Sequence, residues 1–302
     1  MSTTILRTSD AWWVSTPRGA ARIDTDATTT GELLAETEPI ERARTSEETV
    51  DPTTLDLVSP VTAPCRVVAQ MTNFASHVKD AGLDPRTIPL TFFRKTSGSI
   101  SGPFDDIVRP DHVRCLDYEV EIGLVIGRAL PVGTRVTADS WTSFVAGLVV
   151  TNDVSARDVQ LPKTQFFESK SYPTFTPVEL ARFGDLRLRL RVNGEPRQDS
   201  VVDDDMLYSP VEALQALSRF QRLDPGDLLL TGTPAGTALS APPKPVEFVS
   251  RFLPPAVKWK LFFQRQARNP LYLRDGDVVE VAIATDDGAI DLGRQRTVVR
   301  AS

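Results

Sequence analysis

Residues 116–127, L-D-Y-E-V-E-I-G-L-V-I-G, constrain the fold more than any other part of the 302-residue chain. Successive side chains of a β-strand point to opposite faces, so a strand here places Asp117, Glu119 and Glu121 on one face. Three neighbouring carboxylates repel one another and are costly to remove from water unless a cation neutralises them. The apolar continuation of the stretch predicts that this strand does not lie at a fully solvated surface.

Two interpretations of this acidic face follow from the residues. A divalent ion that prefers oxygen ligands, Mg²⁺, Mn²⁺ or Ca²⁺, would neutralise the carboxylates. Alternatively, the stretch forms an edge strand whose acidic side chains face water beside Lys or Arg. An E-x-E pattern on a strand is common, and by itself it does not separate the two.

A second polar site follows residues 144–160, F-V-A-G-L-V-V-T-N-D-V-S-A-R-D-V-Q. The apolar run predicts a buried strand that ends at Asn152-Asp153, with Asp153 at its tip as a further carboxylate ligand. Arg157 and Gln160 follow on a turn or short helix. This segment favours the metal-site interpretation of the acidic strand.

Two later segments complete a recognisable set: K-S-Y-P-T-F-T-P, which begins at Lys170, and T-G-T-P-A-G, which contains Thr233. Together with the paired glutamates and N-D-V-S-A-R-D-V-Q, they occur in the order found in the fumarylacetoacetate hydrolase family, which the chain resembles from about residue 60 to 300 apart from one insertion. Four ordered motifs are specific where one alone is not. The resemblance implies a β-rich α+β fold, with a mixed β-roll catalytic domain, a small N-terminal β-rich domain and pairing into a homodimer.

The resemblance also implies a reaction. The expected enzyme is a divalent-metal-dependent hydrolase that cleaves a C–C bond in a 2,4-dioxo acid of the acylpyruvate or fumarylacetoacetate type, through a metal-stabilised enolate. Its metal ligands would be Glu119, Glu121 and Asp153. The alternatives are a 2-oxo acid decarboxylase, hydratase or isomerase with the same metal site, or a non-catalytic metal-binding or scaffold protein.

His77 and Asp80 lie three residues apart in a segment that predicts a helix with Asn73 as its N-cap and Gly82 as its C-cap. Spacing alone indicates a surface histidine beside a surface acid. The resemblance instead implies a water-activating histidine held by an acid, which is usually Glu in relatives. Asp80 is shorter by one methylene, which leaves its reach to His77 open.

The resemblance assigns further contacts with the substrate. Arg157 and Gln160 would hold the substrate or a developing oxyanion. Lys170 would bind a water of the metal shell or the substrate carboxylate. Lys95, Ser97 and Thr233 would lie near the substrate carboxylate. Lys95 and Ser97 belong to residues 92–102, which predict a polar loop.

Composition excludes some classes of function. The net charge of −6 argues against nucleic acid as a partner, because phosphate contacts need a basic surface. There is no apolar run of membrane-spanning length and no secretory segment at the N-terminus. Cys65 and Cys115 form neither a disulfide framework nor a metal-ligand pattern, so we expect a cytoplasmic protein with reduced thiols.

The predicted organisation is a small domain over residues 1–60, with strands at A-W-W-V and G-A-A-R-I-D, and a catalytic domain over residues 61–302. Within the second domain, residues 238–272 form an insertion whose later part, 257–268, predicts a short amphipathic helix rich in aromatic residues. This helix would pack at a dimer contact, cover the mouth of the site or lie on a membrane surface, in that order of preference.

Two other elements are predicted in the catalytic domain. Residues 186–192 alternate as a strand and meet the hairpin signal Asn193-Gly194. Residues 209–220 predict a helix with apolar side chains at core spacing, the last of them Phe220.

Overall fold

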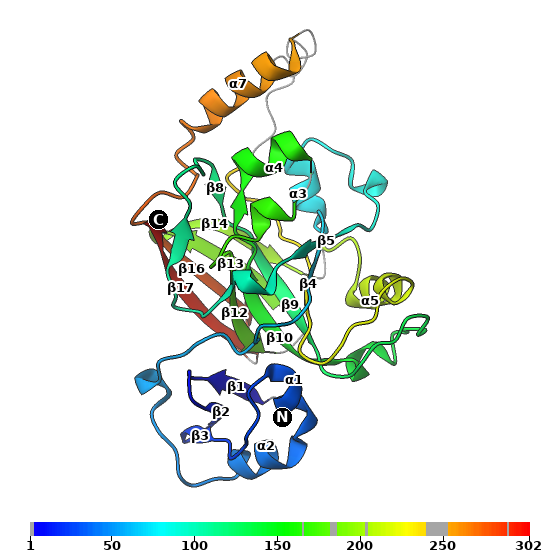
Figure 1. Ribbon diagram of the computed structural model, residues 1–302, viewed down its shortest axis with the longest axis vertical. Coiled ribbons are helices and arrows are strands. Elements are labelled where there is room, and N and C mark those ends of the chain that lie inside the picture. The colour runs from blue at the N-terminus through cyan, green and yellow to red at the C-terminus, as the bar shows by residue number, and fades with distance from the viewer. Residues whose placement is uncertain (1–2, 165, 182–185, 203–204, 240–252, 289) are drawn as a thin grey trace.

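The computed structural model describes residues 3–302 except 165, 182–185, 203–204, 240–252 and 289. Figure 1 shows a small N-terminal lobe at one end of the long axis, a body of curled sheets, and helix α7 (Pro255–Gln266) projecting at the opposite end. The described part of the chain is rich in strands and has few helices. The predicted β-rich α+β class is therefore confirmed.

The strands are β1 (Thr4–Arg7), β2 (Trp12–Thr16), β3 (Gly19–Arg22), β4 (Val67–Gln70), β5 (Phe92–Lys95), β6 (Ile100–Ser101), β7 (Ile107–Arg109), β8 (Leu116–Asp117), β9 (Val120–Ile126), β10 (Val145–Asn152), β11 (Ser155–Ala156), β12 (Thr176–Ala181), β13 (Leu186–Val192), β14 (Glu195–Val201), β15 (Leu228–Leu230), β16 (Val278–Thr285) and β17 (Asp291–Ala301). The other helices are α1 (Thr30–Ala35), α2 (Thr37–Arg44), α3 (Ala75–Asp80), α4 (Arg157–Lys163) and α5 (Pro210–Ser218).

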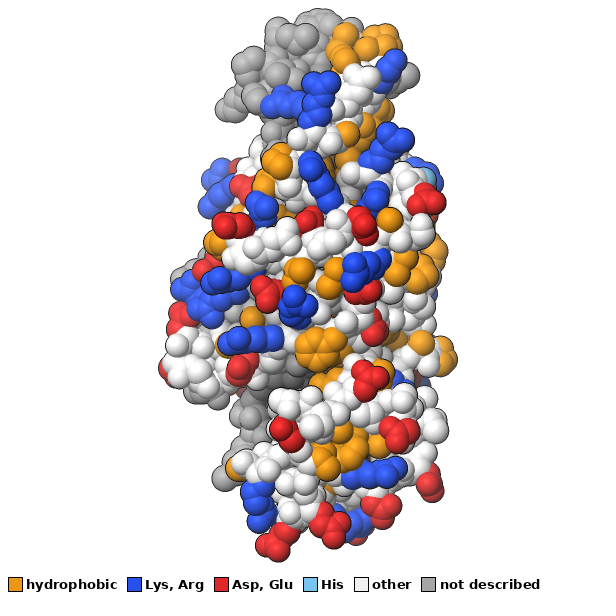
Figure 2. Space-filling view, turned by 90° about the vertical axis from the view of Figure 1, so that its left-hand side faces the viewer, with side chains coloured by type: hydrophobic (Ala, Val, Ile, Leu, Met, Phe, Trp, Pro, Cys, Tyr) orange, Lys and Arg blue, Asp and Glu red, His pale blue; other side chains and the backbone are white. Residues whose placement is uncertain are grey.

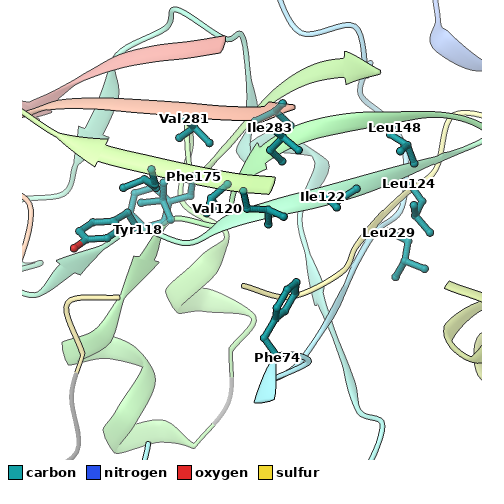
Figure 3. Packing of buried hydrophobic residues seen from close by; sticks show 14 of the residues in the cluster. Phe74, Tyr118, Val120, Ile122, Leu124, Leu148, Phe175, Leu229, Val281 and Ile283 are labelled. Carbon is teal, nitrogen blue, oxygen red and sulfur yellow. The ribbon is translucent and has the colours of Figure 1, made fainter. Parts of the chain in front are cut away.

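Two sheets form the body. One has seven strands in the order β5-β4-β15-β9-β10-β12-β6, and the other has five in the order β14-β13-β16-β17-β7. Alternate side chains of β9 and β10, such as Ile122 and Leu148, pack in one cluster with Val281 and Ile283 of the second sheet (Figure 3). Burial of this apolar surface is the main force that holds the sheets together.

The other face of the seven-stranded sheet is apolar too. Val125, Val149, Leu228 and Leu230 form a separate buried cluster on that face. Strand β9 is therefore covered on both faces, which explains why its sequence is a continuous apolar run rather than an alternating one. Gly123 is required in this layer, because a Cβ there would lie 2.4 Å from Val149 Cγ2.

The antiparallel register of β9 and β10 fixes the position of the polar site. Glu121 lies opposite Thr151, and Val120 lies opposite Asn152. The beginning of β9 consequently meets the end of β10, so the glutamates and the aspartate that follows β10 share one edge of the sheet.

The N-terminal lobe is an antiparallel sheet of β1, β2 and β3 with α1 and α2 beside it. Trp12, Val14 and Leu33 are buried in its own small core. The capping box of Thr29 and Glu32 begins α1. Both strands expected in this region are present, and β1 adds a third, whereas the domain division at residue 60 stays a prediction.

The hairpin at Asn193-Gly194 is confirmed: both residues have positive φ, 53° and 81°, and they join β13 to β14. Other details differ from the predictions. The predicted polar loop over residues 92–102 begins with strand β5, which carries Lys95. Helix α5 ends at Ser218, so Phe220 lies beyond it and is 63% exposed rather than in the core.

The predicted amphipathic helix in the insertion is present as α7. Trp259, Phe262 and Phe263 pack on one another, while Val257 and Leu261 are exposed. Figure 2 shows hydrophobic and basic side chains together at this end of the molecule. In the described part of the chain, no helix is long and apolar enough to cross a membrane. The dimer-contact, flap and membrane-surface interpretations stay predictions, and the earlier half of the insertion, residues 240–252, lies outside the described residues.

Candidate metal centre and catalytic site

Three buried carboxylates converge at the edge where β9 begins and β10 ends. Glu119, Glu121 and Asp153 each offer one carboxylate oxygen, and these oxygens lie within 4.8 Å of one another. The backbone joins the two strands here, because the Asp153 amide donates to the Glu119 carbonyl at 2.8 Å. The structure thus brings together the three predicted metal ligands.

Two lysine ammonium groups lie against these carboxylates. Lys170 Nζ donates to Glu119 Oε2 at 2.6 Å and to Asp153 Oδ2 at 2.5 Å. Lys95 Nζ donates to Asp153 Oδ1 and to the Phe175 carbonyl, the latter at 2.8 Å. Both lysines are almost completely buried, and ion pairs of this kind are stable only when their hydrogen bonds are satisfied.

Glu121 is the exception in this cluster. It accepts a hydrogen bond from the Gly232 amide at 2.8 Å, and the ion pairs of the described residues do not include it. Burial, together with the nearby charges of Asp153 and Glu119, raises its pKa well above the usual value. Gly232 has φ +88°, and a Cβ there would lie 2.8 Å from Asn73 Cβ, so only glycine allows this close approach.

The charges of this cluster shift its other pKa values. Burial opposes ionisation of Glu119, but Arg157 and Lys170 outweigh it and lower the Glu119 pKa. For Lys170, Asp153 and Glu119 outweigh burial and raise the pKa. Burial lowers the pKa of Lys95. Of the two lysines, Lys95 is therefore the one that gives up its proton more readily.

Arg157 stands at the start of α4, where the pairing of β11 with β8 brings it beside Asp117. Its Nε donates to Asp117 Oδ2 at 2.8 Å, its Nη1 to Gln160 Oε1 at 2.9 Å, and its Nη2 to Glu119. The predicted pair of Arg157 and Gln160 is thus assembled next to the metal ligands. Asp117 is directed to Arg157, because strand β8 ends at Asp117 and β9 begins only at Val120.

His77 lies on α3, beside the same cluster. Its Nδ1 is buried and has no hydrogen-bond partner among the described residues. Burial lowers its pKa below the usual value, with Glu119 acting in the opposite direction and Arg157 in the same one. A neutral imidazole with a free nitrogen can accept a proton.

The predicted hydrogen bond between His77 and Asp80 is absent from the described contacts. Asp80 is exposed, and its Oδ2 instead accepts from the Gly236 amide at 3.3 Å. The shorter aspartate side chain explains this, since it reaches the neighbouring loop and not the imidazole. Asn73 is not the cap of α3: the N-cap is Phe74, which makes no side-chain cap hydrogen bond.

Asp205 supplies that cap from a distant part of the chain. Its Oδ1 accepts from the Ser76 amide at 2.7 Å, and its Oδ2 accepts from the Ser76 hydroxyl. Ser76 Oγ in turn accepts from the Ala235 amide at 3.0 Å, which joins α3 to the glycine-rich loop.

The remaining predicted substrate contacts lie around this cluster. Thr233 Oγ1 donates to the Val120 carbonyl at 2.9 Å and accepts from Gln198 Nε2 at 2.8 Å, so it holds the glycine-rich loop against β9. Ser97 begins a short 3₁₀ helix after β5. Their contacts with a substrate stay predictions.

Sequence reasoning missed the pairing of Asp117 with Arg157 and the role of Asp205 as a cap. It also placed Lys95 near a substrate carboxylate, whereas the structure places its ammonium on Asp153. A useful signal for Lys95 existed: a lysine that ends an apolar segment in a chain with an acidic strand is a candidate partner for that strand.

The donor set suits a divalent cation. The three oxygens are hard ligands, all three residues are buried, and the described ion pairs give Glu121 no cationic partner. Glu119, Glu121 and Asp153 would hold the ion.

Known proteins match most of the chain. The family model described as fumarylacetoacetate (FAA) hydrolase C-terminal matches residues 66–300. The mitochondrial oxaloacetate tautomerase of Rattus norvegicus is 35% identical over 195 residues, which are 62% of this chain and 61% of that protein. The 2,4-didehydro-3-deoxy-L-rhamnonate hydrolase of Sphingomonas sp. is 31% identical over 249 residues, 80% of this chain and 75% of that one.

Solved structures are similar over the whole chain. That of a probable 2-hydroxyhepta-2,4-diene-1,7-dioate isomerase from Mycobacterium abscessus has a TM-score of 0.75 and 29% identity, covering 100% of this chain and 99% of the other. That of a fumarylacetoacetate hydrolase from Exiguobacterium antarcticum has a TM-score of 0.70 and 28% identity, covering 100% of both chains. Relatives with this fold are named as tautomerases, hydrolases and isomerases. The ordered motifs, the matched family model and the shared fold show that the chain belongs to the fumarylacetoacetate hydrolase family.

Proposed function

We propose that this protein is a divalent-metal-dependent hydrolase that cleaves a C–C bond in a 2,4-dioxo acid of the acylpyruvate or fumarylacetoacetate type. The observation that carries the proposal is the buried group of Glu119, Glu121 and Asp153 near His77, whose buried Nδ1 has no hydrogen-bond partner among the described residues. The Sphingomonas relative supports the substrate class, because the 2,4-didehydro sugar acid in its name has the same 2,4-dioxo pattern.

A bound Mg²⁺, Mn²⁺ or Ca²⁺ would act as a Lewis acid toward the 2-oxo acid end of the substrate. His77 would take a proton from water, whose oxygen attacks the C4 carbonyl carbon. The C3–C4 bond then breaks, and its electron pair passes to the 2-oxo acid fragment, which takes up a proton at C3. The products are a pyruvate-type acid and a second carboxylic acid.

The polar and cationic side chains around the cluster would bind the substrate and stabilise its developing negative charge. Arg157, fixed by three partners, holds its guanidinium beside Glu119, where it would hold the substrate or a developing oxyanion. Gln160 and Lys170 would bind the substrate or the water close to the metal, whereas Lys95, Ser97 and Thr233 would line the carboxylate end. A role of Asp80 as the partner of His77 stays a prediction, since its described contact is with the Gly236 amide.

A second candidate is an isomerase or tautomerase of a 2-oxo acid. Two observations favour it: the Rattus relative is named an oxaloacetate tautomerase, and the described contacts give His77 no acid partner that would orient it to activate water. Proton transfer next to a carbonyl needs a base but no attacking water. Decarboxylation and hydration of 2-oxo acids belong to the same group of alternatives.

The test is an ultraviolet assay of acylpyruvates and oxaloacetate side by side, with Mg²⁺ or Mn²⁺ and with or without chelator. The proposal predicts chelator-sensitive loss of the diketone enolate band of an acylpyruvate. Turnover of oxaloacetate alone would favour the second candidate. Turnover of neither acylpyruvates nor oxaloacetate would count against both candidate functions.

His77→Ala separates the two candidates further. Hydrolysis should be lost, whereas decarboxylation of a 2-oxo acid, which needs neither activated water nor a base, should continue. The matched control is His112→Ala, since His112, the other histidine of the chain, is exposed and contacts Tyr172.

A cytoplasmic location, a role in catabolism and pairing into a homodimer stay predictions. The measurement for the last is the molar mass in solution by light scattering.

A further inference from the structure

Asp117 is a completely buried carboxylate outside the group of potential metal ligands. Its Oδ1 accepts from the Tyr118 and Ala238 amides at 2.9 and 2.7 Å, and its Oδ2 accepts from Arg157 Nε at 2.8 Å and the Leu239 amide at 3.1 Å. Four donors saturate both oxygens. A buried carboxylate held in this way has little freedom to move.

This carboxylate determines how Arg157 is presented to the site. The three guanidinium nitrogens of Arg157 have one acceptor each, and two of these acceptors, Gln160 and Glu119, belong to the predicted catalytic and metal-binding residues. Asp117 holds the third nitrogen from the other side. The hydrogen bond from Arg157 Nε to Asp117 therefore fixes the orientation of the guanidinium plane relative to Gln160 and Glu119.

The same carboxylate holds the first end of the insertion over residues 238–272, and the second end is fastened to that first end and to β8. At the first end, the amides of Ala238 and Leu239 donate to Asp117. At the second end, Asn269 Nδ2 donates to the Ala238 carbonyl at 2.9 Å, and the Leu273 amide donates to the Leu116 carbonyl at 2.8 Å. The two ends of the insertion are thus fastened next to each other on β8.

We propose that Asp117 is a positioning residue that sets the guanidinium of Arg157 and couples it to the base of the insertion that carries α7. A substrate or partner that moves the insertion would then alter the position of Arg157 through one carboxylate. The substrate-related part of this inference rests on the proposed function, whereas the effect on metal binding does not.

The experiment compares Asp117→Asn, Asn269→Ala and the double variant with the wild type. The control is Asp227→Asn, because Asp227 is also a buried carboxylate paired with an arginine, Arg66, but belongs to another part of the structure. The measurements are kcat and KM, the melting temperature, and the affinity for Mn²⁺ alone by electron paramagnetic resonance.

Asp117→Asn should lower kcat by about 10- to 100-fold with a smaller change in KM, as expected when the support of a catalytic group is lost. It should also weaken Mn²⁺ binding about tenfold, because Arg157 then directs its charge to the ligand Glu119. Asn269→Ala should lower kcat by about threefold or more. The double variant should match Asp117→Asn within about twofold, because both changes act along one path.

The positioning role would be overturned if Asp117→Asn, like Asp227→Asn, lowered only the melting temperature and left kcat and Mn²⁺ affinity unchanged. Normal kinetics and Mn²⁺ binding of Asn269→Ala would overturn the coupling to the insertion. If the wild type turned over none of the 2-oxo acids but Asp117→Asn still weakened Mn²⁺ binding, the proposed function would fail while the positioning role stood.

Discussion

Glu121→Gln should change the stability of the folded protein in opposite directions with and without a bound metal ion. In the buried cluster, Asp117, Glu119 and Asp153 pair with Arg157 and two lysines, whereas the described ion pairs leave Glu121 with the Gly232 amide only. Without metal, the substitution removes an unfavourable buried charge. With metal, it removes a ligand.

The magnitude of the metal effect follows from binding. A cation at 100 times its Kd stabilises the wild type by about 2.7 kcal/mol. This free energy corresponds to roughly 5–10 °C in the melting temperature of a domain of this size. If loss of one ligand weakens binding about 100-fold, the same metal concentration gives the variant about 0.4 kcal/mol, or about 1 °C.

The effect without metal depends on pH. The folded state raises the pKa of Glu121, so its cost to stability is absent below the carboxyl pKa of the unfolded chain and grows as pH rises above it. Glu121→Gln should therefore equal the wild type near pH 4 and exceed it at pH 7. One pKa unit corresponds to about 1.4 kcal/mol, so we expect a gain of at least about 1 kcal/mol.

The assay is thermal unfolding with chelator or with Mn²⁺, at several pH values. The control Asp227→Asn should lower the melting temperature and keep the full metal-dependent shift. The reasoning is refuted if Glu121→Gln melts several degrees lower in chelator and shows the same Mn²⁺ shift as the wild type.

Three further predictions concern single side chains. Lys170→Met should lower the metal-free free energy of unfolding by about 3–5 kcal/mol, since it removes the cation between two buried carboxylates. Urea unfolding should also show that saturating Mn²⁺ recovers part of this loss, and a loss independent of Mn²⁺ would contradict the account. Because burial lowers the pKa of His77, its titration followed by NMR should have a midpoint below pH 6.5. The acid limb of the pH profile of kcat/KM should lie below that pH as well. An acid limb above pH 7 would be inconsistent with this. Cys65 and Cys115, whose pKa values burial raises to about 12, should resist iodoacetamide at pH 8 in the folded protein, as read by mass spectrometry, and rapid labelling of either thiol would argue against their burial.

Local patterns predicted the parts of the fold that depend on local chemistry. The Asn193-Gly194 turn has the positive φ values that its residue types allow, and the amphipathic pattern of residues 257–268 corresponds to helix α7. The predicted metal ligands include Glu119 and Glu121. The antiparallel pairing of β9 with β10 places them beside Asp153, which is distant from them in the sequence.

Tertiary contacts explain what the sequence did not reveal. Asp117 leaves the acidic face because β8 pairs with β11 and presents it to Arg157. Asp205 caps α3 although well over a hundred residues separate it from Ser76. Spacing along the chain carries no information about such contacts, because packing of the complete sheet decides them.

The most direct test of the central claim is a crystal structure with Mn²⁺, in which anomalous scattering locates the ion. The account predicts one strong peak within about 2.0–2.4 Å of oxygens from Glu119, Glu121 and Asp153, with the Lys170 ammonium withdrawn from at least one of the carboxylates that it now contacts. A fully loaded crystal with no peak between these carboxylates, and with both lysines still paired as described, would contradict it.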